Sequence, residues 1–140
     1  MVPTQIRVIY GDTDQMGIVY YANYLRFFES GRTEFLRAKG LRYREIEERL
    51  RIRLPVVEAS VSYRSSARYD DLITVETNLE EVRRVSARFG YRVHRDGELL
   101  ATGHTVHACL ALDGRVQRMP AEMREALARG EDPRGETAGA

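Results

Sequence analysis

Residues 10–24 read YGDTDQMGIVYYANY and place two carboxylates, Asp12 and Asp14, just before a glycine and a run of aromatic side chains. Aspartate is a common turn residue, so both carboxylates could simply close a turn that Gly17 permits. The alternative is catalysis. If a helix begins after this stretch, its unpaired N–H groups could hold an oxyanion while a nearby carboxylate attacks a carbonyl carbon or activates water. The residues alone leave both interpretations open.

A pair of arginines, Arg83 and Arg84, stands in the segment EEVRRVS, where two predicted strands meet. Arginine binds phosphate groups well, so the pair could clamp the phosphates of a ligand. The alternative is an exposed turn with solvated charges, which the neighbouring Glu80 and Glu81 favour. Both interpretations stand equally at this point.

Other catalytic chemistries find less support in the sequence. His104 and His107 are three apart in a predicted strand, so they point to opposite faces, and no HExxH spacing is present. We therefore expect no metal site. Cys109 is the single cysteine and is expected to be a small core residue rather than a nucleophile. The chain has no GxSxG, P-loop or GxGxxG motif.

The composition is that of one globular domain, which we place at residues 1–129, followed by a flexible polar tail at residues 130–140. A formal net charge of +1 argues against a nucleic-acid binder. The N-terminus lacks the pattern of a signal peptide, and no apolar stretch reaches the roughly 20 residues that cross a bilayer. We expect a cytoplasmic protein with no membrane span.

The stretch with the two aspartates lies between a predicted strand at residues 4–10 and a predicted helix at residues 23–39. Apolar side chains recur at helical spacing in this helix, with Asn23 as a candidate N-cap and Gly40 as a candidate C-terminal stop. Gly31, in mid-helix, costs about 1 kcal/mol relative to alanine. Its presence indicates that the helix lies close against a flat surface such as a sheet.

After a short charged helix predicted at residues 43–51, the apolar period changes to two, the pattern of β-strands. The alternation is clearest at residues 87–94, and Asp96-Gly97 predicts a hairpin to the next strand, at residues 99–112. A small helix is expected at residues 121–129. These elements predict an α+β fold in which an antiparallel sheet wraps a long helix. The free edges of such a sheet favour a homo-oligomer.

The stretch YGDTDQMGIVYYANYLRFFESGRTEFL resembles the signature of the hot-dog-fold acyl-CoA thioesterases, in particular the 4-hydroxybenzoyl-CoA thioesterase-like group. The shared pattern is an aspartate, two variable residues, a glycine, two apolar residues, aromatic residues, Asn-Tyr and a helix. The resemblance continues through SSARYDDLITVET and EVRRVS and covers residues 5–118.

This resemblance implies a hot-dog fold, with a long central helix wrapped by an antiparallel sheet. The implied activity is hydrolysis of an acyl-CoA thioester to a free acid and coenzyme A, without a cofactor. The implied assembly is a homo-oligomer, either a dimer with paired sheets or a homotetramer made as a dimer of dimers. Its active sites would lie at the subunit interface.

The resemblance also assigns roles at the start of the helix. The family's catalytic aspartate falls on Asp14, as a nucleophile or as a general base, and the family's glycine falls on Gly17. The residue whose backbone N–H polarises the thioester carbonyl falls on Tyr21. Asp12 matches a position that is commonly acidic, and a structural role explains it better.

Further along the chain, the resemblance implies substrate-binding residues. Arg83 and Arg84 match the stretch that contacts the phosphates of coenzyme A in relatives, and Ser86 lies along the pantetheine path. Asp70 and Asp71 match a block that is expected to support the site or the fold.

Four alternatives to an acyl-CoA hydrolase stay open, one of them a structural or interaction protein whose site has lapsed. A non-catalytic acyl-CoA binder would keep the arginines and need no carboxylate at the helix end. A dehydratase of the same fold generally uses a histidine or an acid pair near this motif, and no histidine lies there. A thioesterase could also act on an acyl carrier protein, and the acyl group itself is not specified by these residues.

Overall fold

The elements follow the predicted order of a strand, a long helix, a short helix and then long strands joined by hairpins. The computed structural model describes residues 2–129, and the predicted tail at residues 130–140 lies outside the described residues. The helical elements are α1 (Asn23–Ala38), α2 (Tyr43–Glu45), α3 (Ala121–Ala128), the 3₁₀ turn η1 (Tyr10–Asp12) and the π-helical turn η2 (Ile46–Leu50). The strands are β1 (Val2–Arg7), β2 (Ile52–Arg53), β3 (Val56–Tyr63), β4 (Leu72–Val82), β5 (Ser86–Arg95), β6 (Glu98–Ala108) and β7 (Leu110–Ala111).

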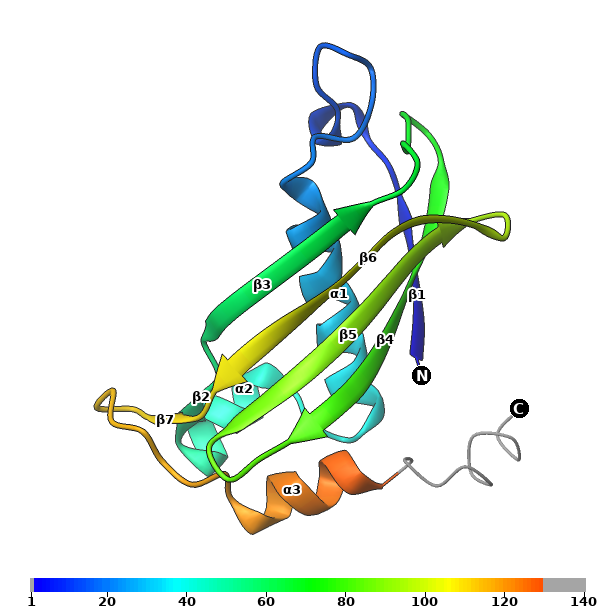
Figure 1. The fold of residues 1–140 in the computed structure, drawn as a ribbon. Helices are drawn as coiled ribbons and strands as arrows, with labels where there is room; N and C mark the ends of the chain where they lie inside the picture. Colours follow the sequence, from blue (N-terminus) through cyan, green and yellow to red (C-terminus); the bar gives the residue numbers. More distant parts are fainter. Residues whose placement is uncertain (1, 130–140) are drawn as a thin grey trace.

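Five strands form one antiparallel sheet in the order β1-β4-β5-β6-β3. Hairpins join β4 to β5 and β5 to β6. Strand β1 pairs with β4 and strand β3 pairs with β6, so β1 and β3 form the two edges. Helix α1 crosses one face of this sheet, as Figure 1 shows. Strands β2 and β7 form a separate two-stranded sheet beside α2. The predicted α+β arrangement, an antiparallel sheet wrapped around a long helix, is confirmed.

The alternating pattern of the strands gives each of them one face in the core. In β4, Ile73, Val75 and Thr77 are fully buried, while the residues between them are partly exposed. Asp96 and Gly97 form the turn between β5 and β6 with φ values of 49° and 83°. Two consecutive positive φ values are what a two-residue hairpin turn of this kind requires, so the predicted hairpin is confirmed.

Gly31 is the point of closest approach between α1 and the sheet. A Cβ atom built on Gly31 would lie 2.6 Å from Thr77 Oγ1 and 2.8 Å from Val75 Cγ1. Both distances are shorter than non-bonded atoms tolerate, so only glycine fits here without movement of the sheet. The glycine predicted to bring the helix against a sheet therefore does so.

We expect Gly31→Ala to lower the free energy of unfolding by about 1–3 kcal/mol, the usual cost of overpacking, although alanine is the better helix former. The measurement is urea denaturation at neutral pH. Ser30→Ala is the matched control, because Ser30 is the adjacent α1 residue and is exposed to solvent. Equal stability of the two variants would contradict the close contact.

Helix α1 ends as predicted but begins differently. Gly40 adopts φ +80°, and the Leu41 N–H bonds back to the last turn at 2.8 Å, which closes the helix in the Schellman pattern. The prediction of Asn23 as the N-cap is wrong, because Ala22 holds that position and Asn23 is the first helical residue. The Asn23 side chain instead donates to the Asp12 carbonyl oxygen at 2.9 Å and ties the helix to the preceding loop.

Two strands are shorter than predicted. The strand expected at residues 4–10 ends at Arg7, because η1 follows soon after it. The strand expected at residues 99–112 is broken at Cys109, so that β7 pairs with β2 instead of continuing β6. The Cys109 N–H donates to the Val85 carbonyl oxygen at 2.8 Å, which takes the chain out of the large sheet. The Cys109 side chain is fully buried, as predicted for a small core residue.

Candidate active site

Asp14 lies in the tight loop that connects η1 to α1, at the upper end of the molecule in Figure 1. Its Oδ1 accepts the Met16 N–H at 2.8 Å, and its carbonyl oxygen accepts the Gly17 N–H at 2.9 Å. Gly17 has φ +81°, a conformation that side-chain-bearing residues rarely adopt, so it permits this turn. Asp14 Oδ2 accepts no hydrogen bond from residues 2–129, which leaves half of the carboxylate available.

Asp12 has a different environment and is only 4% exposed. Its Oδ2 accepts the Ile9 N–H at 2.9 Å, and its Oδ1 lies 3.3 Å from an Arg26 guanidinium nitrogen. The Asp12 carbonyl oxygen also accepts the Tyr20 N–H at 2.8 Å. Both carboxylate oxygens are thus used to hold the loop, in agreement with the structural role expected for this residue.

Tyr21 stands at the entry of α1. The N–H groups of Tyr21 and Ala22 have no acceptor among the residues that the structure describes, whereas the Asn23 N–H already donates to the Tyr20 carbonyl oxygen. Unpaired N–H groups at a helix N-terminus carry partial positive charge. The Tyr21 carbonyl oxygen accepts the Tyr63 hydroxyl at 2.8 Å, which anchors this backbone segment to the end of β3.

Asp14 and Tyr21 line one hollow of about 260 Å³. The rings of Tyr24 and Tyr63 meet edge to face, with their centroids 5.3 Å apart, and burial raises the pKa of both phenols. These phenols therefore stay protonated at neutral pH. The remaining lining residues are Met16, Ile18, Val19, Arg64, Ser65 and Ser66. The hollow combines a carboxylate, the unpaired N–H group of Tyr21 at a helix end, and walls made of both apolar and polar side chains.

Asp71 supports the wall of this hollow from outside. Its carboxylate accepts the Arg68 N–H at 2.8 Å and lies 2.6 Å from an Arg95 nitrogen. Partial burial alone would raise the pKa of Asp71, but the Arg68 N–H and the Arg95 guanidinium outweigh it and lower that pKa. Arg95 also donates to the Ser66 carbonyl oxygen at 3.2 Å, so the ion pair holds the Arg64–Ser66 segment in place. This is the kind of supporting role expected for the YDD block.

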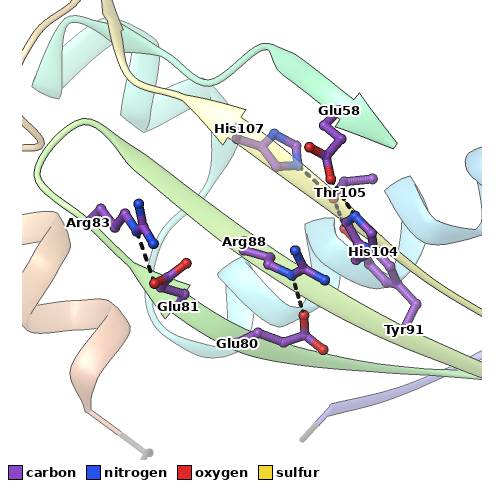
Figure 2. A network of polar contacts seen from close by, with 9 residues as sticks. All are labelled: Glu58, Glu80, Glu81, Arg83, Arg88, Tyr91, His104, Thr105 and His107. Atoms are coloured by element: carbon purple, nitrogen blue, oxygen red, sulfur yellow. Dashed lines mark hydrogen bonds and ion pairs between the residues drawn. The ribbon is translucent and has the colours of Figure 1, made fainter. Parts of the chain in front are cut away.

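Arg83, Arg84 and Ser86 lie in or beside the turn between β4 and β5, at the opposite end of the sheet from the Asp14 loop (Figure 1). Strand β4 has 11 residues, so it separates the two ends by about 35 Å. Arg83 pairs with Glu81 at 2.9 Å, a contact that Figure 2 shows, and Arg84 is exposed. One copy of the chain therefore does not bring these predicted substrate-binding residues to Asp14.

Arg64, Ser65 and Ser66 line the Asp14 hollow, although the sequence did not single them out as site residues. They follow β3, about 50 positions after Asp14, and the bonds of the Arg64 and Ser65 N–H groups to the Leu100 carbonyl oxygen fix them there. One sequence signal could have identified this segment: it stands next to the YDD block, in the part of the chain that resembles the thioesterases.

Comparison with known proteins decides the family. The model of the thioesterase-like superfamily matches residues 8–127. The chain belongs to this superfamily. It is 35% identical over 124 residues to an acyl-CoA thioesterase, YbgC, of Haemophilus influenzae, which covers 87% of this chain and 90% of that protein.

Solved structures of similar proteins share the fold. A hypothetical protein from Thermus thermophilus, TT1821, superposes with a TM-score of 0.87 at 39% identity, over 90% of this chain and 96% of that one. The 4-hydroxybenzoyl-CoA thioesterase of Pseudomonas sp. strain CBS-3 superposes with a TM-score of 0.82 at 29% identity, over 89% and 97%. The predictions of the family, of the hot-dog fold and of a thioester hydrolase are confirmed at this level. Within residues 2–129 of this superfamily member, no helix has the length and apolar character to span a membrane.

Proposed function

We propose that this thioesterase-superfamily protein hydrolyses acyl-CoA to a free acid and coenzyme A in the cytoplasm, with Asp14 as its catalytic carboxylate. One observation carries the proposal. The free Oδ2 of Asp14 and the unpaired N–H group of Tyr21, at the N-terminus of α1, belong to residues around the same hollow. A thioester carbonyl in this hollow would meet a nucleophile or base and an electrophilic partner together.

The mechanism follows from these groups. The thioester oxygen accepts hydrogen bonds from the backbone N–H groups of Tyr21 and Ala22, where the dipole of α1 favours the negative charge that develops on it. In one version Asp14 attacks the carbonyl carbon, coenzyme A leaves as a thiolate that takes up a proton, and water cleaves the resulting anhydride. In the other version Asp14 removes a proton from the attacking water. Gly17 serves both versions by letting the loop turn back toward the helix.

We also propose that the working form is an oligomer, a dimer or a dimer of dimers. Edge strand β3 pairs only with β6 among the described strands, and its backbone is open on the other side. Its exposed apolar side chains, Val56, Val57 and Tyr63, are 47%, 62% and 48% accessible. An open apolar edge of this kind favours pairing with a second copy. In such an assembly, Arg83 and Arg84 of another copy could approach the coenzyme A bound beside Asp14.

The role of the arginines gives a separate prediction. We expect the double variant Arg83→Ala, Arg84→Ala to raise KM for acyl-CoA by about tenfold or more with little change in kcat, because it loses contacts to charged phosphates. The same variant should hydrolyse acyl-N-acetylcysteamine, which has no phosphates, as wild type does. Arg115→Ala, at an exposed turn, is the matched control. An unchanged KM for acyl-CoA would remove both arginines from the substrate site.

The activity itself is tested by thiol release from acetyl-, octanoyl-, palmitoyl- and 4-hydroxybenzoyl-CoA. Steady-state hydrolysis of at least one of them is the expected result, and the panel also gives the acyl preference. Tight binding of these thioesters without turnover would favour a non-catalytic acyl-CoA binder. If only thioesters of acyl carrier protein were hydrolysed, the substrate would be an acyl carrier protein thioester and not an acyl-CoA.

A further inference from the structure

A second hollow, of about 340 Å³, lies at the other end of α1 from Asp14. The turn η2 forms one wall, and the small β2–β7 sheet forms the other. Its apolar lining consists of Ile46, Ile52, Leu54, Pro55 and Leu110, and its polar lining consists of Tyr43, Glu47 and Arg53. None of these residues lines the hollow that contains Asp14. Its size is at the lower end of the range for small-molecule sites.

Arg32 forms a buried positive charge behind this hollow. The residue is 7% exposed, and no carboxylate in residues 2–129 forms an ion pair with it. Its Nε donates to the Tyr43 hydroxyl at 2.9 Å, and its Nη1 donates to the Tyr91 hydroxyl at 3.0 Å. Burial of a cation against neutral partners is costly, which makes this region favourable for an anion.

One chain of hydrogen bonds leads from Arg32 through the core to the wall of the hollow. Because a guanidinium only donates, the Tyr91 hydroxyl passes its hydrogen to Thr105 Oγ1 at 2.6 Å. Thr105 in turn donates to His107 Nε2 at 2.9 Å, as Figure 2 shows. The remaining ring hydrogen, on Nδ1 of His107, is donated to the Leu54 carbonyl oxygen at 2.9 Å. Every hydrogen in this branch has an acceptor.

The other branch ends differently. The Tyr43 hydroxyl accepts from Arg32, so its own hydrogen must find a different partner. Within the described part of the chain, no atom accepts it. Tyr43 lines the hollow, and so do Arg53 and Glu47, which form an exposed ion pair with each other at 3.7 Å. The hollow thus offers apolar walls and a hydrogen-bond donor polarised by a buried cation.

We propose that this hollow binds a carboxylic acid with a short aliphatic or aromatic tail. The tail packs against Pro55 and Leu110, above the buried Ile46 and Ile52, and the carboxylate accepts the Tyr43 hydroxyl hydrogen next to Arg32. The proposal goes beyond the hydrolysis at Asp14 and does not depend on it. The acid that a thioesterase releases has this same chemistry, so its product could occupy the site.

Octanoate is the probe, with 1-octanol as its neutral counterpart, in the full-length protein labelled at the isoleucine δ1 methyl groups. Octanoate should shift the Ile46 and Ile52 methyl resonances and leave Ile18, in the Asp14 hollow, unchanged. Octanol should bind at least about tenfold more weakly, because it lacks the charge. Three results would overturn the proposal: shifts at Ile18 alone, octanol binding as tight as octanoate binding, or no shift at all. A second copy of the chain that covers the hollow would also give no shift.

Tyr43→Phe keeps the ring and removes only the donor. It should weaken octanoate binding at least about tenfold while changing octanol binding little. Tyr69→Phe is the matched control, because Tyr69 is exposed and stacks on Tyr10 outside both hollows. Leu110→Trp should fill the hollow and abolish binding of both probes. Octanoate affinity that is unchanged in both Tyr43→Phe and Leu110→Trp would overturn the assignment, whatever the hydrolase activity proves to be.

Discussion

Asp14→Asn is expected to lower kcat for acyl-CoA hydrolysis by at least about 10²-fold, because asparagine can neither attack the carbonyl carbon nor accept a proton from water. The variant should fold normally. The substituted amide would still offer a side-chain oxygen to the Met16 N–H, so the turn before α1 keeps its hydrogen bond. The measurement is thiol release under saturating acyl-CoA.

Asp12→Asn gives the matched comparison two residues earlier. Asp12 is buried and holds the Ile9 N–H and Arg26, so its loss should lower stability by about 1–2 kcal/mol rather than abolish turnover. The two variants together separate chemistry from loop structure. A larger loss of kcat in Asp12→Asn than in Asp14→Asn would reverse the assignment of the two carboxylates.

The second large effect concerns stability in acid. His107 is 1% exposed, and burial lowers its pKa to about 4, helped by the nearby Arg32 charge and opposed by the bond to Leu54. The unfolded chain has a histidine pKa of about 6.5, so between these values it binds more protons than the folded protein. The contribution of the neutral His107 to the free energy of unfolding is therefore fully present above about pH 6.5 and is lost as the pH drops to about 4. The expected loss is about 3 kcal/mol.

Urea denaturation between pH 7.5 and pH 4 measures this loss. His107→Gln should be less stable than wild type at pH 7.5 and should show a shallower decline with acid, because the titrating group has been removed. His104→Gln is the control, since His104 is partly exposed and pairs with Glu58 at 2.6 Å on the opposite face of β6 (Figure 2). An equal acid slope in wild type and His107→Gln would contradict the buried neutral histidine.

Local patterns predicted the elements that depend on local forces. The apolar spacing of α1, the Gly40 stop, the Gly31 contact and the Asp96-Gly97 hairpin all arise from neighbouring residues or from one face of an element. The failures involve distant partners. The Asn23 side chain reaches back to the Asp12 carbonyl oxygen, and no local capping preference reveals such a contact.

The same distinction holds for the break in the strand expected at residues 99–112. Its alternation continues past Cys109, but the Cys109 N–H bonds to Val85 and its carbonyl oxygen accepts the Gln117 N–H. These contacts take Cys109 away from the large sheet. Periodicity alone cannot detect partners that the fold brings together from outside the strand.

The candidate site was partly visible in the sequence for a physical reason. A helix N-terminus and the loop before it lie within a few residues of each other, so spacing could bring the two aspartates and a helix end together, and the family resemblance then assigned Asp14, Gly17 and Tyr21. Arg64 lies in the same hollow but reaches it through the pairing of β3 with β6. Arg83 and Arg84 lie at the far end of the sheet, and any approach to Asp14 requires a second copy of the chain.

A single-turnover experiment tests the central claim most directly. Excess wild type or Asp14→Asn is mixed with the acyl-CoA that wild type hydrolyses fastest, and bound thioester and released thiol are followed in the same run. We predict that both proteins bind the thioester with similar affinity and that only wild type releases thiol rapidly. Thiol release at equal rates in the two proteins would contradict the assignment of Asp14 as the catalytic carboxylate.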